Sequence, residues 1–195
     1  MSTETARPAP VFLPRRTPRL VLCTPTPEDV DELLTFRAAP AVTRWLLSST
    51  VDPRAYREGW LEAPDETEGH YAVVRLHDTA IGTIGLSLTG AMAQPTGRLA
   101  GREGKVSYIL NPEQAGNGYA TEALTSMLEL AFDQLGLHRV TAGCFADNTA
   151  SWRVMEKVGM RREQHGVKDS WHEELGWLDG FTYAILREEW LERTQ

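Results

Sequence analysis

The sequence predicts a single α/β domain with a mixed β-sheet flanked by helices, and three patterns lead to this class. Two alternating apolar segments, 71–76 and 81–86, flank the polar turn 77–79 and indicate an antiparallel hairpin. A third strand, 106–110, is followed by a glycine-bearing turn and an amphipathic helix. A further strand, 138–145, follows that helix, so we expect the strands on either side of it to be parallel neighbours.

The length and composition fit one ordinary folded domain. The chain has 195 residues, of which 42% are hydrophobic and 24% are charged, enough to bury a full core. It carries 27 acidic and 20 basic residues, a formal net charge of −7. This balance argues against a dedicated nucleic-acid binder and favours cationic partners.

Neither a metal site nor a membrane segment is expected. The two cysteines, Cys23 and Cys144, are too few for a disulfide framework, and no CxxC or HxxH spacing occurs. The first residues lack the apolar stretch of a secretory signal, and no run of about 18 apolar residues is present. A cytoplasmic location follows by default.

The first part of the chain is expected to form an arm, a strand and a helix. Residues 1–17 are rich in Pro, Thr and Arg and indicate a flexible N-terminal arm, with the domain spanning 18–195. Residues 19–23 show the alternating side-chain pattern that predicts a strand. Thr26 is placed to cap a helix that runs through Phe36, with Pro at its first position.

Two less regular regions follow this helix. Apolar residues at 45–47 and 56–61 indicate two short helical pieces broken by Pro40, Pro53 and Pro64. The segment 90–104 carries four glycines and a proline, and we expect it to be a long loop.

The C-terminal part is expected to contain two helices and two strands. The helix after the glycine turn presents one apolar stripe and ends near Gly136. A short helix occupies 148–159, and a strand lies near 160–164. The next segment is rich in His, Asp and Glu and is interpreted as a loop before the strand 181–186.

The turn Gly116-x-Gly118-x-Ala120 is a candidate anion site. The first N–H groups of the following helix have no internal acceptors, and glycine lets the backbone approach a phosphate closely. A Walker loop is excluded because no Gly-Lys-Ser/Thr follows. A dinucleotide-binding turn fits poorly because Thr121 stands where its third glycine belongs. The third interpretation is that the turn binds the phosphates of coenzyme A.

Several segments resemble the GNAT N-acetyltransferases, most closely the RimJ/RimL type that acetylates ribosomal-protein N-termini. They are Arg19-Leu20, the stretch 117–123 (NGYATEA), the stretch 148–160 (NTASWRVMEKVGM) and the stretch 183–190 (YAILREEW). The resemblance covers about residues 18–190. One departure concerns the pyrophosphate loop, which in the family begins with Arg or Gln: here Ala115 holds that position and Gln114 precedes it.

The resemblance implies the GNAT acyl-CoA N-acyltransferase fold, in which two neighbouring parallel strands splay apart and pantetheine lies between them. In this chain those strands are 106–110 and 138–145. A backbone N–H near the end of the first strand would meet the thioester carbonyl and stabilise an oxyanion. The implied cofactor-binding residues are Tyr108, Ile109, Leu110, Ala115, Gly116, Asn117, Gly118, Tyr119, Ala120, Thr121, Asn148 and Ser151.

The family pattern also implies catalytic residues. It places Asn148 and Ser151 near the sulfur of the donor, with Ser151 as the proton donor to the leaving thiolate. Both residue types equally suit the start of a helix as local caps. Acidic residues in loops or at strand starts are candidates for the general base, and Asp179 is selected because it lies near the family's C-terminal strand; the others are Glu103, Glu173 and Glu174.

Two further residues have alternative roles. Cys144 stands among alternating apolar neighbours and is interpreted as a core residue and not as an acyl carrier. Tyr183 is interpreted as a core or cleft aromatic, with proton donation as a minor alternative.

The resemblance therefore implies an acyl-CoA-dependent N-acyltransferase that uses acetyl-CoA, or another acyl-CoA, as co-substrate and no metal. The acceptor amine would be a protein N-terminus or a small molecule, and it would attack directly in a ternary complex. A homodimer is expected only from the family. A CoA-binding sensor without turnover is a rival interpretation, and a dinucleotide-dependent oxidoreductase is a third.

Overall fold

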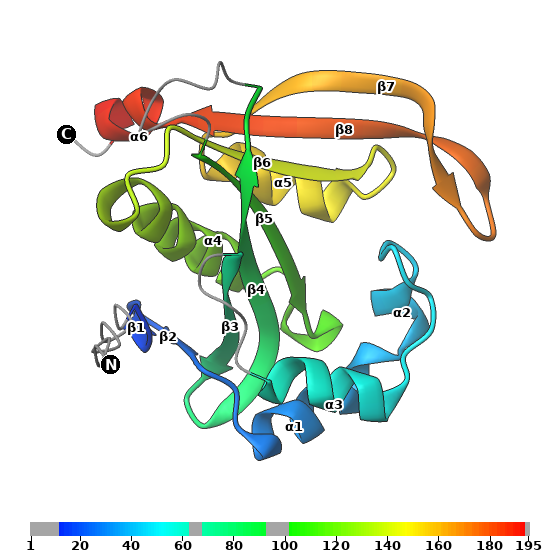
Figure 1. Cartoon of the computed structure of the whole chain (residues 1–195). Coiled ribbons are helices and arrows are strands. Elements are labelled where there is room, and N and C mark those ends of the chain that lie inside the picture. Colours follow the sequence, from blue (N-terminus) through cyan, green and yellow to red (C-terminus); the bar gives the residue numbers. More distant parts are fainter. Residues whose placement is uncertain (1–11, 63–67, 93–101, 194–195) are drawn as a thin grey trace, which may run out of the picture.

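The computed structural model describes residues 12–62, 68–92 and 102–193, and its centre is a mixed β-sheet (Figure 1). The eight strands lie in the order β1-β2-β3-β4-β5-β6-β8-β7. Their bounds are β1 Arg15–Arg16, β2 Leu20–Cys23, β3 Gly69–Leu76, β4 Thr79–Gly90, β5 Arg102–Leu110, β6 Arg139–Phe145, β7 Arg161–His172 and β8 Gly176–Leu186. The expected mixed α/β class is confirmed.

Strands β5 and β6 are the parallel neighbours among the described strands, and they separate after a short contact. Their register runs only from Glu103↔Arg139 to Lys105↔Thr141. Beyond these pairs β5 stays with β4 as far as Leu110, while β6 stays with β8 as far as Phe145. The expected splay of the two strands is present, and it opens a gap in the middle of the sheet.

Six α-helices and two single turns surround the sheet in the described part of the chain. Their bounds are α1 Pro27–Arg37, α2 Pro40–Thr43, α3 Pro53–Leu61, the 3-10 turn η1 Pro112–Gln114, α4 Tyr119–Glu129, the π-helical turn η2 Leu130–Gln134, α5 Thr149–Lys157 and α6 Arg187–Arg193. No helix among these residues combines the length and apolar character needed to cross a membrane.

Two of the prolines expected to break helices instead begin them. Pro40 and Pro53 each occupy the first turn of a helix, where proline suits the backbone torsion and its missing N–H is not needed. The apolar residues 45–47 therefore follow α2 as a turn and do not form a helix. Pro64 lies outside the described residues.

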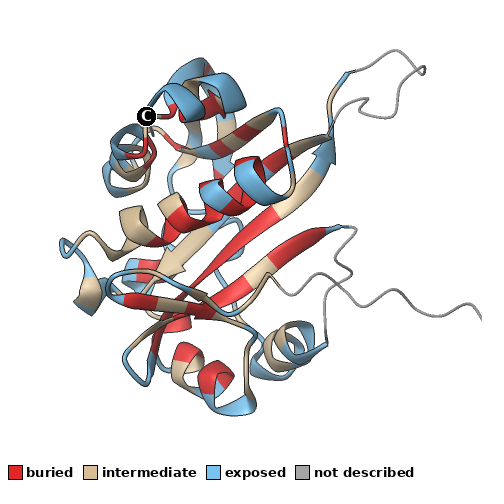
Figure 2. Ribbon diagram, turned by 90° about the vertical axis from the view of Figure 1, so that its left-hand side faces the viewer, coloured by how far each residue is buried: buried red, intermediate tan, exposed pale blue. Residues whose placement is uncertain are grey.

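The two faces of the sheet bury different cores, because successive side chains of a strand point to opposite faces. On β3, Ala72 and Val74 belong to the large core with α4, α5 and α6. Val73, between them, belongs to a smaller core with α1 and α2. Buried residues accordingly mark both the inner faces of these helices and the strands between them (Figure 2).

Helix α1 is held at its start by a buried polar cluster. Thr26 caps the helix as expected, and Asp29 completes a capping box with it. Asp29 is 2% exposed and accepts a hydrogen bond from Arg75 Nε of β3 at 2.6 Å. Burial by itself raises the pKa of Asp29, but the hydrogen bonds from Arg75 and Thr26 outweigh it and the pKa is lowered.

The expectation of a loop between 165 and 180 is wrong, since β7 and β8 continue through it as one long hairpin. This hairpin extends past the ends of the other strands of the sheet (Figure 1). Most β7 side chains are exposed, so the strand has no apolar alternation to read. Lys168 has a positive φ of 50°, and the register shifts between Gly166 and Ser170, which interrupts the pattern further.

Two other expected irregular segments are partly described. Within the arm 1–17, Arg15 and Arg16 form the edge strand β1 beside β2. Residues 1–11 lie outside the described part of the chain. Within the loop 90–104, β5 already begins at Arg102 and residues 93–101 also lie outside the described part.

Candidate active site

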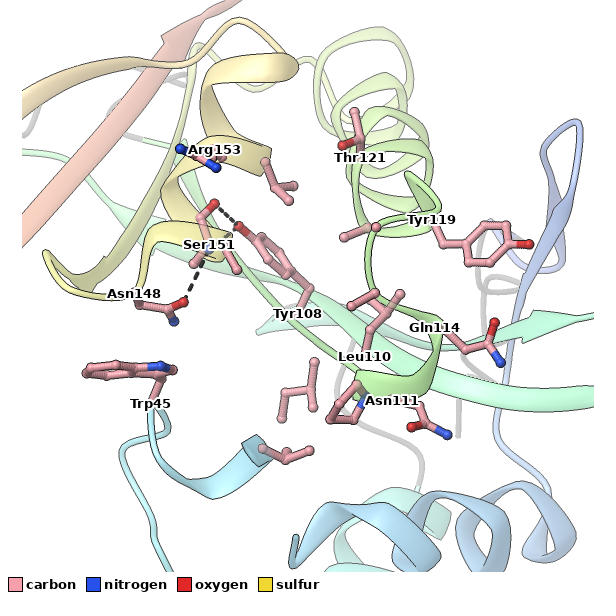
Figure 3. A pocket seen from close by; sticks show the side chains of 18 of the residues that line it. Trp45, Tyr108, Leu110, Asn111, Gln114, Tyr119, Thr121, Asn148, Ser151 and Arg153 are labelled. Carbon is pink, nitrogen blue, oxygen red and sulfur yellow. Dashed lines mark hydrogen bonds between the residues drawn. The ribbon is translucent and has the colours of Figure 1, made fainter. Parts of the chain in front are cut away.

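A cavity of about 450 Å³ lies where β5 and β6 separate. Its walls come from α2 and the turn after it, from the end of β5, from the glycine turn with the start of α4, and from α5 (Figure 3). The lining residues are Ala41, Val42, Trp45, Leu46, Tyr108, Ile109, Leu110, Asn111, Pro112, Gln114, Ala115, Gly116, Gly118, Tyr119, Ala120, Thr121, Asn148, Ala150, Ser151, Arg153, Val154 and Lys157. We call it the donor cavity, after the acyl donor that the family resemblance implies.

The glycine turn offers backbone N–H groups to the donor cavity. Gly116 and Gly118 both have φ of +81°, a conformation that side-chain-bearing residues rarely adopt. Gly118 is the N-cap of α4 and offers no side-chain hydrogen bond to the helix. The first N–H groups of α4 have no acceptor within the helix, so the positive end of α4 is available to an anion.

Arg19, in the N-terminal part of the chain, stabilises this turn. Its Nη1 donates to the carbonyl of Asn117 at 2.9 Å, and its guanidinium lies 4.6 Å from the centre of the Tyr119 ring. Its Nε donates to Glu122 in the first turn of α4 at 2.7 Å. The Arg19-Leu20 motif thus supports the turn, and Leu20 is buried in the core beneath it.

Glu122 receives several hydrogen bonds at once. Besides Arg19 Nε, its carboxylate accepts the backbone N–H of Arg19 at 2.8 Å and the hydroxyl of Thr17. Desolvation raises the pKa of Glu122, but the hydrogen bonds from Thr17 and Arg19 and the Arg19 charge outweigh it, and the net pKa is lowered. Glu122 is therefore ionised at neutral pH and anchors the start of α4.

Tyr108 and Ser151 meet across the gap between the splayed strands (Figure 3). The phenol of Tyr108 donates to the Ser151 carbonyl at 2.9 Å, and its oxygen lies 3.1 Å from Ser151 Oγ. When the phenol proton is given to the carbonyl, the Ser151 hydroxyl is the donor in the second contact. Burial raises the pKa of Tyr108 to about 12, so the phenol stays protonated at neutral pH.

Asn148 begins α5 and lines the donor cavity. Its Oδ1 accepts the backbone N–H of Ser151 at 3.2 Å, the capping contact expected from the sequence. Trp152 Nε1 donates to the Ala146 carbonyl at 3.1 Å and fixes the turn before the helix. The cap therefore sets the place of Ser151 at the cavity wall.

Cys144 and Tyr183 both lie outside the lining of the donor cavity. Burial raises the pKa of Cys144 to about 11, with a smaller opposing contribution from its hydrogen bond to Ser151, so the thiol is protonated at neutral pH. Tyr183 is 1% exposed and donates to Glu156 at 2.9 Å. Burial and that contact raise the pKa of Tyr183 to about 12. Both placements agree with a core role.

A second cavity of about 600 Å³ adjoins the first and shares Ala41 and Leu46 with it. Its other walls are the residues around α2 and the turn of the β7–β8 hairpin. They are Pro40, Thr43, Arg44, Leu47, Ser49, Phe145, Trp171, His172, Glu173 and Glu174. We call it the acceptor cavity, after the acceptor amine that the family resemblance implies. Glu173 accepts a hydrogen bond from the Ser49 hydroxyl.

The structure places Asp179 away from both cavities. Its carboxylate accepts the backbone N–H of Lys168 at 3.0 Å and contacts His165 Nε2 at 2.7 Å within the β7–β8 hairpin. The Lys168 N–H first, and then His165, lower the pKa of Asp179, which makes it a weak proton acceptor. Glu103 likewise lines neither cavity and lies 3.4 Å from Arg139. Glu173 and Glu174 are the base candidates that reach a cavity.

Of the residues expected to bind the cofactor, all but Asn117 line the donor cavity. Asn117 instead shapes the turn, since its Nδ2 donates to the Gln114 carbonyl at 3.2 Å. The cations Arg153 and Lys157 on the α5 wall were not given a role. The sequence could have indicated this role, because residues 153 and 157 are four positions apart and therefore lie on the same face of the helix.

The comparisons with known proteins agree with this geometry. The family model described as an acetyltransferase (GNAT) domain matches residues 19–161. The uncharacterized N-acetyltransferase YnaD of Bacillus subtilis is 42% identical over 86 residues, which are 44% of this chain and half the length of YnaD.

Two solved structures share the fold. A GNAT-family acetyltransferase from Bacillus anthracis is 27% identical with a TM-score of 0.73, covering 89% of this chain and 98% of that one. Mycobacterium smegmatis RimJ, solved in complex with CoA-disulfide, is 21% identical with a TM-score of 0.72, covering 87% and 83%. At this identity the likeness to RimJ concerns the fold alone.

The matched model covers most of the chain, which therefore belongs to the GNAT acetyltransferase family. Members of this family use acetyl-CoA as co-substrate. The N-acetyltransferase class expected from the sequence is confirmed at this level, whereas the RimJ/RimL type is not distinguished.

The residues of the donor cavity fit coenzyme A. A Cβ built on Gly116 would meet nothing within 4 Å, and one on Gly118 would meet only Arg19 Nη2 at 3.5 Å, so the turn is open on its outer side. A pyrophosphate there would meet the N-terminus of α4 and the cations of the α5 wall. Backbone groups of β5 beyond Lys105 are free of β6 and can pair with an extended chain.

Glu122 provides a test of the turn's anchor. Because its folded pKa lies below the unfolded value of 4.5, its stabilisation is complete above that pH and is lost as the pH falls through the folded pKa. We expect Glu122→Gln to lower the free energy of unfolding by about 1–2 kcal/mol at neutral pH and to flatten its decline in acid. Urea denaturation across the acid range measures both effects.

The matched control is Glu129→Gln on the same helix, whose side chain is 48% exposed beside Arg15. Because the Glu129 carboxylate is exposed to solvent, this ion pair should contribute less than about 1 kcal/mol. Equal losses and equal pH profiles for the two variants would contradict the assigned role of Glu122.

Proposed function

We propose that this protein is an acyl-CoA-dependent N-acyltransferase that transfers acetyl from acetyl-CoA to a primary amine. The observation that carries the proposal is the donor cavity, which has backbone donors of the glycine turn at one end and the Tyr108–Ser151 pair at the other. It shares Ala41 and Leu46 of the α2 wall with a second cavity, which leaves room for an acceptor.

On the donor side, the N-terminus of α4 and the glycine turn hold the pyrophosphate of CoA, and Arg153 and Lys157 add positive charge from α5. The pantetheine pairs with the free edge of β5. A backbone N–H near Tyr108–Leu110 then receives the thioester oxygen and stabilises the negative charge that develops on it.

The transfer needs no covalent enzyme intermediate. The amine nitrogen attacks the thioester carbon, a C–N bond forms, and the C–S bond breaks with its electron pair going to sulfur. For this step the single hydroxyl hydrogen of Ser151 turns from the Tyr108 oxygen to the departing sulfur, while the phenol of Tyr108 still donates to the Ser151 carbonyl and keeps this residue beside the gap. The proton lost by the amine balances the one gained by the thiolate, so the products are an amide and CoA.

On the acceptor side, Glu173 and Glu174 favour an amine that arrives as a cation. One of them, or water, takes the proton that must leave before attack. The RimJ/RimL-like motifs support a protein N-terminal α-amine as the acceptor, and the acidic wall also suits a small polyamine. Both belong in the test.

The direct experiment incubates the full chain with acetyl-CoA and a panel of N-terminal peptides, polyamines and amino-sugar antibiotics. We expect thiol release above the hydrolytic background with at least one amine class, and the mass of one acetyl group added to that amine. Tight CoA binding without thiol release for any amine would contradict the proposal and favour a CoA-binding sensor without turnover.

Ser151→Ala should separate catalysis from binding. Losing the hydrogen bond to the departing sulfur should lower kcat by about a hundredfold, while the Kd for CoA changes little. The control is Ser107→Ala, since Ser107 is an exposed serine next to Tyr108 that lines neither cavity. Steady-state kinetics and calorimetric CoA titration measure the two quantities. An unchanged kcat in Ser151→Ala would remove Ser151 from the mechanism.

Gly118→Val should affect the cofactor itself. A β-branched side chain is strained at φ of +81° and projects beside Arg19 at the start of α4, so we expect the Kd for CoA to rise by about tenfold or more. Gly59→Val in α3 is the control, because a Cβ there meets nothing within 4 Å and the residue has no positive φ. Equal CoA affinity in both variants would place the pyrophosphate elsewhere.

A further inference from the structure

One buried histidine bonds to both sides of the acceptor cavity. His172 is the last residue of β7, is 6% exposed, and lines that cavity. Its Nε2 lies 2.6 Å from the carbonyl oxygen of Arg44, the C-cap of α2. Its Nδ1 accepts the backbone N–H groups of Glu174 and Leu175, each at 3.2 Å. The ring therefore connects α2 to the turn of the β7–β8 hairpin.

These partners define the protonation of the ring. A carbonyl oxygen can only accept, so Nε2 carries the hydrogen and donates it to Arg44. A backbone N–H can only donate, so Nδ1 is the acceptor and the imidazole is neutral. Both ring nitrogens are occupied by main-chain groups, and His172 is not free to take a proton from the acceptor amine.

The aromatic neighbours of His172 belong to different cavities. The centre of its ring lies 5.6 Å from that of Trp45 and 5.4 Å from that of Phe145. Trp45 lines the donor cavity, as Asn148 does (Figure 3), whereas Phe145 lines the acceptor cavity. The histidine ring thus packs in the partition between the two spaces.

Apart from His172, the α2 segment is held by Val42 and Leu46, which pack against the small core of α1, and by the Ser49 hydroxyl, which donates to Glu173. Val42 is the buried residue of the four-residue helix α2, while Ala41 and Leu46 face both cavities. A shift of this segment would widen the acceptor cavity and move Trp45 relative to Ser151. A hydrogen bond at the end of α2 is well placed to prevent such a shift.

We infer that His172 is a positioning residue whose bond to the Arg44 carbonyl fixes the α2 wall and so determines the fit of the acceptor amine. The inference rests on the proposed function for the identity of the acceptor. The bond itself is a property of the fold and can be measured without turnover.

Two substitutions of His172 test the hydrogen bonds of its two ring nitrogens separately. The amide nitrogen of His172→Gln can reach the place of Nε2 and donate to Arg44, whereas the amide oxygen of His172→Asn takes the place of Nδ1 and accepts from the hairpin turn. The Asn variant should therefore keep the turn and lose the bond to α2. His165→Asn, on the same hairpin and lining neither cavity, is the matched control.

The first measurement is hydrogen–deuterium exchange of the α2 amides of Val42, Thr43 and Arg44, which are hydrogen-bonded to Ala39 and Pro40 carbonyls. The second is the KM for the best amine of the panel and for acetyl-CoA. We expect faster α2 exchange and an acceptor KM raised about three- to tenfold in His172→Asn, with the KM for acetyl-CoA within about twofold. His172→Gln should restore slower exchange and a lower acceptor KM.

The outcomes are distinguishable. Equal α2 exchange in the Asn, Gln and control variants would overturn the positioning role. Faster exchange with an unchanged acceptor KM would overturn its link to the acceptor. If the wild-type protein acetylates no amine, the proposed function fails, and the exchange comparison still decides whether His172 holds α2.

Discussion

The separation of β5 from β6 is the constraint on which the candidate site depends. Each strand has a second partner that it follows over its whole length, β4 for β5 and β8 for β6. The two partners diverge, so the parallel ladder ends after Lys105 and Thr141. Backbone N–H and C=O groups beyond that point require another partner, because an unpaired group inside a protein is costly. The gap is therefore a place where an extended ligand is favoured.

The ends of this gap are stabilised by residues from remote parts of the chain. At one end Arg19 of the N-terminal region and Glu122 of α4 hold the glycine turn, although they are 103 positions apart. At the other, Tyr108 of β5 contacts Ser151 of α5. These contacts do not fill the gap, since a cavity of about 450 Å³ remains beside them. The backbone donors and the hydroxyl thus stay in place while the space between them remains open.

The sequence was most informative where a local pattern and the tertiary structure agree. The hairpin 71–86, the stripe of α4 and the cap at Thr26 follow from alternation, helical periodicity and capping chemistry. The glycine turn was singled out from its local backbone needs, whereas Ser151 was proposed from the family pattern. Only the family resemblance, however, brought these separate segments to one cleft.

What the sequence missed has physical reasons. The β7–β8 hairpin extends beyond the core, so most β7 residues are exposed and leave no alternating pattern. Asp179 was selected for its position in the chain, but its carboxylate bonds to His165 and Lys168 of its own hairpin. The α2 wall escaped notice because a four-residue helix has no period to read, and its contact with His172 joins positions 128 apart.

The state of Cys144 has a consequence for redox behaviour. A disulfide is attacked by a thiolate, and a thiol whose pKa is raised to about 11 is almost never ionised at neutral pH. The Ser151 side chain, which lowers this pKa to a smaller degree, lines the donor cavity, in which the proposed reaction would release the free thiol of CoA. Burial therefore makes Cys144 a poor nucleophile toward a CoA disulfide, so this thiol should resist mixed-disulfide formation.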